Sequence, residues 1–535
     1  MKNILTTLLL LFIFHFSMFS QNTIGLLVSK PEAYDGYTLF TPERSNSVFL
    51  IDNCGNSIHT WTFNNVPKFT CYLLENGNLL RTGLDTIEIR DWDNNLIWEY
   101  NLLTNLNLLK HHDIEPLPNG NILCIVKENI SEQAQIDLGK NPTLLNGTLK
   151  SEKIIEIEPI GANAVNIVWE WRFADHLIQD FDATKSNYGT VSTHPELVDF
   201  NYDEPNIDHS NWLHINSIDY NLELDQILFS SRTLSEIYII DHSTTTMEAA
   251  SHTGGNQNKG GDFLWRWGNP QIYRQGTVND QKLRGQHDAK WITNTYINEN
   301  KISVFNNQSD ATRTFSSIHI LDVDNTYPLQ NASFLPVDYF WSWSGEIRNE
   351  TVFESKKSGV QALENGNLLI CETEKGRLSE ITLAGEIVWI YRNPVGPTTY
   401  NQYDTNAQIF NNNGIFRGEK YPKTYAAFTG RDLTPGDILE DTNNLSEACN
   451  SLDIDTFVIR KDSFSFNNPV VNNTLSFHHG LENTNIHIYN TLGKLIFKTN
   501  KFSGKELKIP NLKPGIHFLK FEKEGVIVID KAIVK

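Results

Sequence analysis

The sequence repeats one pattern six times: two strand-like segments joined by a short turn, with a tryptophan near the end of the second segment. Apolar and polar residues alternate along the segments, and Asp, Asn and Gly occupy the turns, as antiparallel strands with tight connections require. Helical periodicity is hard to find in this region. The six pairs end at Trp61, Trp98, Trp171, Trp267, Trp343 and Trp389.

Five of these pairs have another strand-like run just upstream, and the N-terminal pair has none. Sheets of about four strands, repeated roughly four to eight times, close into a β-propeller. We therefore predict an all-β fold, a six-bladed β-propeller, whose first blade takes its inner strand from residues 405–430. An irregular pair of β-sandwiches is the alternative. The five upstream runs are residues 69–81, 112–126, 214–231, 287–306 and 358–372.

Three of the upstream runs begin with a histidine: His112, His214 and His287. Equal phase in a repeated unit implies equal position, so these residues are predicted to converge at one end of the central channel. Counting back from a shared Asn-Gly-Asn turn, Ser358 and Phe69 hold the same place in two other copies.

An asparagine and an arginine accompany the second of these histidines. Asn216 lies two residues after His214, and Arg232 follows the next strand. The fork of donors on arginine suits a tetrahedral oxyanion, and asparagine can add a neutral donor. We predict a pocket for one anion, with no metal and no cofactor. The alternative is a histidine-ligated metal enzyme that also uses Asp113 and Asp288.

Charge and cysteine content exclude some classes of function. The formal net charge of −20 disfavours a nucleic-acid partner, because such binding needs a basic surface. A small anionic substrate remains compatible with it, since local charge can dominate inside a pocket. The five cysteines show no CxxC or zinc-like spacing, and their disulfide connectivity cannot be assigned from the sequence.

The N-terminus predicts export. Lys2 precedes an apolar stretch, Ile4 to Phe19, as in a secretory signal peptide. No later stretch approaches the roughly 20 apolar residues of a spanning helix, so no transmembrane segment is predicted. The predicted divisions are a signal peptide at 1–20, the propeller at 21–445, a linker at 446–462 and a small β-domain at 463–535.

The last 70 or so residues resemble the C-terminal sorting domain of the type IX secretion system of Bacteroidetes. Asn468-Pro469, IHIYNTLGKLIF and LKPGIHFLKFEKEG carry the resemblance. It implies a small β-sandwich-like domain, the type IX secretion machinery as a partner, and a secreted or cell-surface location. A carbohydrate-binding or adhesive module is the alternative.

Residues from about 31 to 430 resemble the bacterial arylsulfate sulfotransferases. Three motifs carry this resemblance: HDIEPLPNGN at His112, HINS with SSR at 214–232, and GQHDAKW with ISVFNN at 286–307. Such enzymes are exported six-bladed propellers that transfer a sulfuryl group from an aryl sulfate to a phenol without the nucleotide donor PAPS. The chain is accordingly expected to be a transferase acting on small phenols and aryl sulfates.

The resemblance also implies roles for single residues. His287 matches the nucleophile, which would form a sulfohistidine in a ping-pong reaction. The remaining matches are His214, Asn216 and Arg232 for sulfate binding and charge stabilisation, His112 for the other active-site histidine with an ambiguity toward His111, and Ser358 for a hydroxyl residue. A non-catalytic binding or adhesion propeller is the remaining alternative.

Overall fold

The structure is a computed structural model in which the chain forms two compact units, residues 1–443 and 444–535. The predicted signal peptide and linker lie outside the described residues. Those residues are 22–66, 68–203, 211–293, 301–308, 314–405, 409, 412–440, 466–490, 494–510, 512–523 and 526–534.

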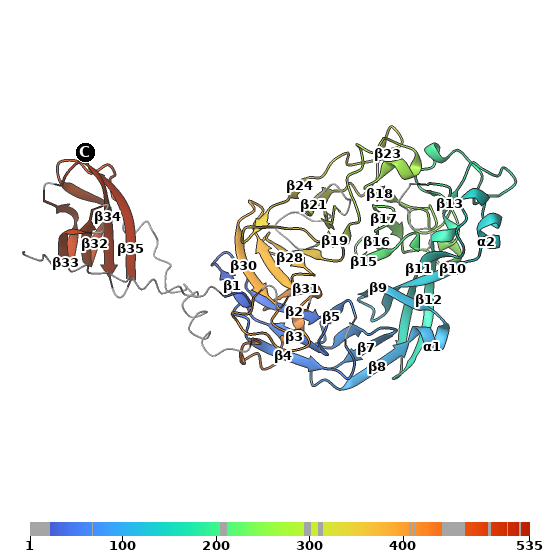
Figure 1. Cartoon of the computed structure of the whole chain (residues 1–535), viewed down its shortest axis with the longest axis horizontal. Coiled ribbons are helices and arrows are strands. Elements are labelled where there is room, and N and C mark those ends of the chain that lie inside the picture. Colours follow the sequence, from blue (N-terminus) through green and yellow to red (C-terminus); the bar gives the residue numbers. More distant parts are fainter. Residues whose placement is uncertain are drawn as a thin grey trace, which may run out of the picture. The chain divides into compact units, whose positions relative to one another are not determined.

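The described part of the larger unit contains six antiparallel sheets of four or five strands arranged in a ring (Figure 1). The inner strands are β31 (Ile415–Pro422), β5 (Cys71–Leu73), β9 (Leu109–Pro116), β15 (Ile215–Asn221), β19 (His287–Ile292) and β27 (Gly359–Ala362). The second strands are β2 (Gly36–Pro42), β6 (Leu79–Thr82), β10 (Ile122–Ile130), β16 (Gln226–Ser231), β20 (Lys301–Asn306) and β28 (Leu368–Glu372).

The outer half of each sheet carries the repeated tryptophan pattern. Third strands are β3 (Ser47–Ile51), β7 (Thr86–Arg90), β11 (Leu149–Ile160), β17 (Glu236–Asp241), β21 (Ser317–Asp322) and β29 (Arg377–Ile381). Fourth strands are β4 (Ser57–Thr62), β8 (Leu96–Asn101), β12 (Ala164–Arg172), β18 (Trp265–Trp267), β24 (Trp341–Trp343) and β30 (Ile387–Arg392), with β1 (Gly25–Ser29) added to β30.

The closing tryptophans join neighbouring sheets. The indole of Trp61 donates to the carbonyl of Asp91 at 3.0 Å, and that of Trp389 donates to Asn53 at 2.8 Å, each in the next sheet around the ring. Five of the six repeat tryptophans are buried, all but Trp343. A buried indole N–H needs an acceptor, so these bonds fix the sheets beside one another.

The ring closes through the two ends of the unit, as the sequence predicts. Strand β31, within the predicted interval 405–430, pairs antiparallel with β2 near the N-terminus. The all-β propeller prediction is confirmed, and β31 supplies the inner strand that the first repeat lacks.

Short elements fill the loops. Helices are α1 (Leu102–Leu106), α2 (Glu132–Asp137), α3 (Thr246–Ala249), η1 (Pro142–Leu144), η2 (Phe173–Asp175), η3 (Val191–Thr193), η5 (Pro270–Tyr273) and η6 (Ala426–Phe428). Short strand pairs are β13 (Leu177–Ile178) with β14 (Val198–Asp199), β22 (Leu329–Gln330) with β23 (Ser333–Phe334), and β25 (Glu346–Ile347) with β26 (Glu350–Thr351). No helix of the described residues is long and apolar enough to span a membrane.

The smaller unit is one antiparallel sheet in its described part. The strand order is β33 (Leu495–Lys508), β32 (Thr474–Tyr489), β34 (Gly515–Lys523) and β35 (Val526–Val534). Register shifts recur between β32 and β33, which bends both strands around a core that includes Phe466, Leu475 and Phe521.

Candidate active site

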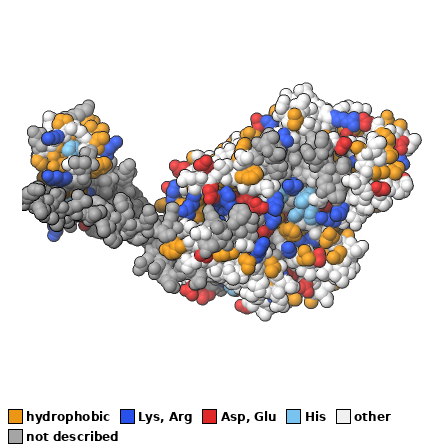
Figure 2. Space-filling view, in the orientation of Figure 1, with side chains coloured by type: hydrophobic (Ala, Val, Ile, Leu, Met, Phe, Trp, Pro, Cys, Tyr) orange, Lys and Arg blue, Asp and Glu red, His pale blue; other side chains and the backbone are white. Residues whose placement is uncertain are grey.

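The predicted convergence of the first two histidines is present at the start of the inner strands. Nε2 of His112 lies 2.9 Å from Nε2 of His214, and their rings stack with centroids 4.8 Å apart. Figure 2 shows histidine side chains flanked by Lys and Arg near the middle of one face of the larger unit. Residues 102 apart in sequence therefore form one imidazole pair.

His287 is held as a neutral ring with a defined lone pair. Its Nδ1 donates to Oδ1 of Asn307 at 2.8 Å and to the carbonyl of Gly285 at 3.1 Å, so Nε2 is the unprotonated nitrogen. Nε2 accepts from the backbone N–H of Lys357 at 3.1 Å. The pKa of His287 falls to about 3, mainly through burial and further through the positive charge of Arg232.

Asn307 fixes this tautomer. Its Nδ2 donates to the carbonyls of Glu354 and Lys357 at 2.9 and 3.0 Å, which leaves Oδ1 to accept from His287. The motif ISVFNN contains Asn307, for which the sequence analysis predicts no separate role. A carbonyl or amide that accepts from one ring nitrogen determines which nitrogen keeps its lone pair.

The His112–His214 pair holds one proton between two facing nitrogens. The amide of Asn211 donates to Nδ1 of His214, so neutral His214 carries its proton on Nε2 and points it at His112. Burial, with the neighbouring charges of His111 and His214, lowers the pKa of His112 well below its usual value. Nδ1 of His112 is buried without a partner in the described structure.

His111 turns away from this pair toward a carboxyl group. Its Nδ1 contacts Glu152, whose other oxygen accepts from the backbone N–H of Ile215 at 2.6 Å. Burial lowers the pKa of His111 to about 2 and raises that of Glu152 to about 8, so neither group carries a full charge. His112 is the neighbour whose ring faces His214.

Arg232 is a cation without an anion. In the part of the chain that the structure describes, its guanidinium forms no hydrogen bond or ion pair; its backbone N–H donates to the carbonyl of His214 at 3.1 Å, and its carbonyl accepts from the N–H of Ser235 at 3.3 Å. Partial burial lowers its pKa from the usual value, but the guanidinium stays charged. An anion between Arg232 and His287 would give this charge a partner.

Two predicted substrate-binding residues have structural partners instead. Asn216 donates one amide N–H to the carbonyl of Gln286 at 2.7 Å, so its side chain holds the segment before His287. The hydroxyl of Ser358 accepts from the backbone N–H of Thr373 at 3.1 Å and is buried in its own turn. Both residues are buried, and their roles in anion binding stay predictions.

The repeat register of His287 is also one residue different from the prediction. Phe69, His112, His214 and Ser358 all have positive φ, and in the fifth copy this conformation belongs to Asp288. A register shift between His287 and Lys290 in the pairing of β19 with β20 accompanies the change. His287 therefore lies one residue before the positive-φ position that the other copies place at the start of the inner strand.

A buried arginine from the closing strand locks the histidine-bearing strands together. Arg417 pairs with Asp113 at 2.6 Å and with Asp288 at 3.0 Å, and donates to the carbonyl of Asn216 at 3.2 Å. The two aspartates follow His112 and His287 directly, so they neutralise Arg417 and are not free metal ligands. Sequence reasoning missed Arg417, although it lies in the interval that was expected to close the ring.

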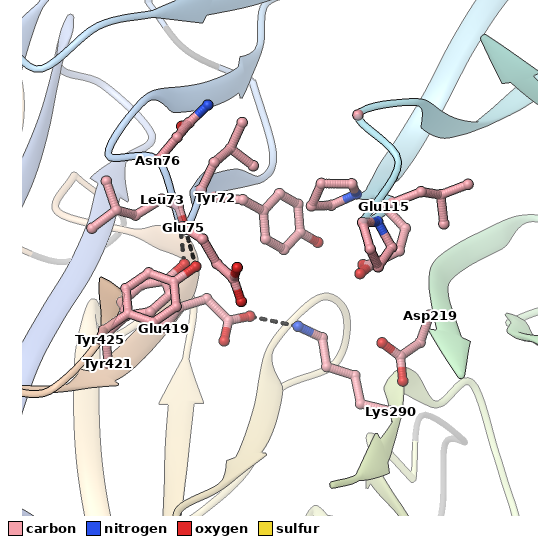
Figure 3. Close-up of a pocket in the computed structure, with 15 residues that line it drawn as sticks. Tyr72, Leu73, Glu75, Asn76, Glu115, Asp219, Lys290, Glu419, Tyr421 and Tyr425 are labelled. Carbon is pink, nitrogen blue, oxygen red and sulfur yellow. Dashed lines mark hydrogen bonds and ion pairs between the residues drawn. The ribbon is translucent and has the colours of Figure 1, made fainter. Parts of the chain in front are cut away.

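The same strands carry a second charged layer, further along the channel. Lys290 pairs with Glu419 at 2.5 Å beside a cavity of about 570 Å³ that Tyr72, Glu115 and Asp219 also line (Figure 3). Burial raises the pKa of Asp219 to about 7 and that of Glu115 well above its usual value.

This cavity lies further along the strands than the histidines. Glu115 lines it three positions after His112 on β9, or roughly 10 Å away at about 3.3 Å per residue. Tyr72, which also lines it, donates to Asp113 at 3.0 Å. Arg417 and its aspartates lie between the two ends.

Comparison with known proteins identifies the family. Residues 26–327 match the model of the arylsulfotransferase (ASST) family, and residues 466–535 match that of the secretion system C-terminal sorting domain. The sorting domain indicates export by type IX secretion to the cell surface or the extracellular space. None of the curated proteins matches the chain.

The solved structures that resemble this chain have low sequence identity to it. A Bacteroides caccae protein of unknown function is 11% identical, covering 67% of this chain and 94% of that one, with a TM-score of 0.38. A streptogramin B lyase is 12% identical (71% and 86% covered, TM-score 0.33), and the Myceliophteria thermophila Cps50 β-propeller domain is 8% identical (68% and 88%, TM-score 0.35).

The family match spans more than half of the 535 residues and includes His112, His214, Arg232 and His287. It ends before Ser358 and Arg417. This protein belongs to the arylsulfotransferase (ASST) family.

Proposed function

We propose that the protein transfers a sulfuryl group from an aryl sulfate to a phenol through a covalent intermediate on Nε2 of His287, without PAPS. The observation that carries the proposal is the fixed tautomer of His287: Asn307 holds the proton on Nδ1, so the lone pair is on Nε2, where only a backbone N–H contacts it. Family membership supports arylsulfotransferase activity in general.

In the first half-reaction Nε2 of His287 attacks the sulfur atom in line with the leaving phenol. An N–S bond forms, the S–O bond to the aryl group breaks, and its electron pair leaves on the phenolate. The charge of Arg232 offsets the negative oxygens that would repel the nucleophile. The donor must displace the hydrogen bond from Lys357, which leaves that N–H beside the sulfuryl group.

The imidazole pair stabilises the leaving group and takes up the proton of the acceptor. The first phenol departs as the phenolate, which accepts a hydrogen bond from the N–H between Nε2 of His112 and Nε2 of His214. In the second half-reaction the acceptor phenol gives its proton to this pair, its oxygen attacks sulfur, and the N–S bond breaks. The proton then passes from the imidazolium to the first phenolate or to solvent, and the enzyme regains its starting state.

An assay with p-nitrophenyl sulfate, phenol and a chelator, without PAPS, tests the proposal. We expect release of p-nitrophenol that depends on phenol, with parallel lines in double-reciprocal plots, as a ping-pong reaction gives. Release that requires PAPS, or that proceeds only with both substrates bound, would contradict it. Release without phenol would show water as the acceptor.

A metal-dependent reaction is the second candidate, because one observation favours it. Ring nitrogens of His111, His112 and His214 lie within 4.8 Å of one another, a spacing that three ligands of one ion can adopt. Against it, Nδ1 of His111 is engaged by Glu152 and Arg232 brings positive charge to the same end. Elemental analysis decides: stoichiometric metal that activity requires would replace the sulfohistidine mechanism.

A further inference from the structure

A second histidine cluster lies at the outer edge of the propeller, away from the inner strands. It consists of His176, which follows η2, and of His252 and Asp262 from the loop between α3 and β18. The ring of His176 stacks on Trp171 of outer strand β12, with centroids 5.2 Å apart and planes at 5°. Sulfuryl transfer, as proposed above, uses none of these residues.

We propose that His176, His252 and Asp262 form a binding site for a zinc-like divalent metal ion, which ties the loop before β18 to the segment after β12. One ligand atom from each residue lies within 4.8 Å of the other two. Two imidazoles and a carboxylate, with water in the fourth position, are a common ligand set for Zn²⁺.

The hydrogen bonds of His176 present its lone pair to this point. Nε2 of His176 lies 2.9 Å from the carbonyl of Ala249, which can only accept, so Nε2 carries a proton. Metal-bound histidines commonly make this kind of bond with their second nitrogen. The other nitrogen, Nδ1, faces Oδ1 of Asp262 at 2.8 Å, and His176 is fully buried.

A buried lone pair opposite a buried carboxylate requires a positive charge between them or a second proton. Nδ1 of His252 also faces Asp262, at 2.8 and 3.1 Å from its two oxygens. Two imidazole nitrogens therefore converge on one carboxylate, and a metal ion would satisfy all three groups together.

The available space fits a small ion after a modest adjustment. Metal–ligand bonds of about 2.0–2.2 Å place tetrahedral ligands roughly 3.3 Å apart, a few tenths of an ångström beyond the contacts present. The side chain of His252 is 61% exposed and can swing outward, which also leaves a coordination position open to water. Gly261 allows the close approach: a Cβ there would lie 2.6 Å from Nε2 of His176.

Titration of chelator-treated full-length protein with Co²⁺ tests this site. Co²⁺ substitutes for Zn²⁺ and gives visible ligand-field absorption. We expect one equivalent to bind with a tetrahedral spectrum, Zn²⁺ to displace it, and Zn²⁺ to raise the Tm. His252→Ala, which removes an exposed ligand without opening the core, should weaken that binding by about a hundredfold or more.

Two further variants separate this cluster from the histidines of the channel. Asp262→Asn should also abolish the spectrum, whereas His214→Ala, in the channel cluster, and His194→Ala, outside both clusters, should leave it unchanged. The proposal is overturned if Co²⁺ does not bind saturably, if His252→Ala binds it as the parent does, or if His214→Ala removes the spectrum. These readouts do not depend on sulfotransferase activity.

Discussion

The two ends of the propeller channel are built from the same strands but differ in how their charged groups are paired. At the histidine end Arg232 has no acidic partner, and the lone pair on Nε2 of His287 accepts from the backbone N–H of Lys357. At the cavity end Lys290 is paired with Glu419, and burial raises the pKa of the carboxyl groups of Glu115 and Asp219. The uncompensated charge of Arg232 at one end, and the ion pair and raised carboxyl pKa values at the other, favour anion binding at the histidine end.

Arg417 lies between these two ends and forms ion pairs with aspartates on two of the inner strands. Its two ion pairs fix Asp113 and Asp288, and each aspartate adjoins a histidine of the site. On β31 the side chains at 417, 419 and 421 follow the period of two along the channel, one layer after another. Strand geometry thus determines where successive layers of side chains lie along the channel. The residue that each strand supplies determines the chemistry of each layer.

Replacing His287, the proposed nucleophile, gives the largest expected effect. His287→Gln keeps a neutral side chain of comparable size but removes the imidazole lone pair, so we expect kcat for p-nitrophenyl sulfate to fall by roughly 10⁴-fold or more. Glu115→Gln at the other end is the matched reference. Activity of His287→Gln within tenfold of the parent would mean that another group attacks sulfur.

Removing the buried arginine comes next. Arg417→Met leaves Asp113 and Asp288 as uncompensated buried charges, which should cost about 3–5 kcal/mol in the free energy of unfolding. Urea denaturation measures this, and Arg417→Lys should recover part of the loss. If Arg417→Met unfolds at the same urea concentration as the parent, the ion pairs of Arg417 do not stabilise the fold as described above.

Arg232 is expected to affect the reaction and not the fold. Arg232→Met removes one charged donor from the transition state, so kcat/KM should fall by about 10²–10³-fold. The Tm should stay close to that of the parent, because no protein partner of the guanidinium is lost in the described structure. A large loss of stability with intact turnover would reverse this interpretation.

The smallest effect is expected at the cavity end. Burial raises the pKa of Glu115 well above its usual value, so Glu115→Gln replaces a group that tends to be neutral with another neutral group. We expect less than about a twofold change in kcat/KM. A substitution that is away from the reacting groups and leaves the charge unchanged seldom perturbs an active site. A much larger change would show that the two ends are coupled through Arg417.

Much of this architecture can be predicted from the sequence because it repeats. The tryptophan-ended pairs, the closing strand near residue 415 and the meeting of His112 with His214 all follow from phase alone. Resemblance to a family, more than phase, singled out His287, whose position is displaced by one residue at a register shift.

The parts that could not be predicted depend on contacts between distant segments. Arg417 lies about 300 residues from Asp113, and no local pattern links the two. The bond from the amide of Asn216 to the carbonyl of Gln286 likewise joins segments 70 residues apart. The cluster of His176, His252 and Asp262 lies in insertions without repeat phase, so the repeated pattern does not point to it.

The most direct test of the central claim is mass spectrometry of the protein after a rapid quench with p-nitrophenyl sulfate and no acceptor. The account predicts one added sulfuryl group, on the peptide that contains His287, and its loss when phenol is added. No adduct in His287→Gln and a full adduct in Glu115→Gln would complete the result. An adduct on His112 or His214, or turnover without any adduct, would contradict the account.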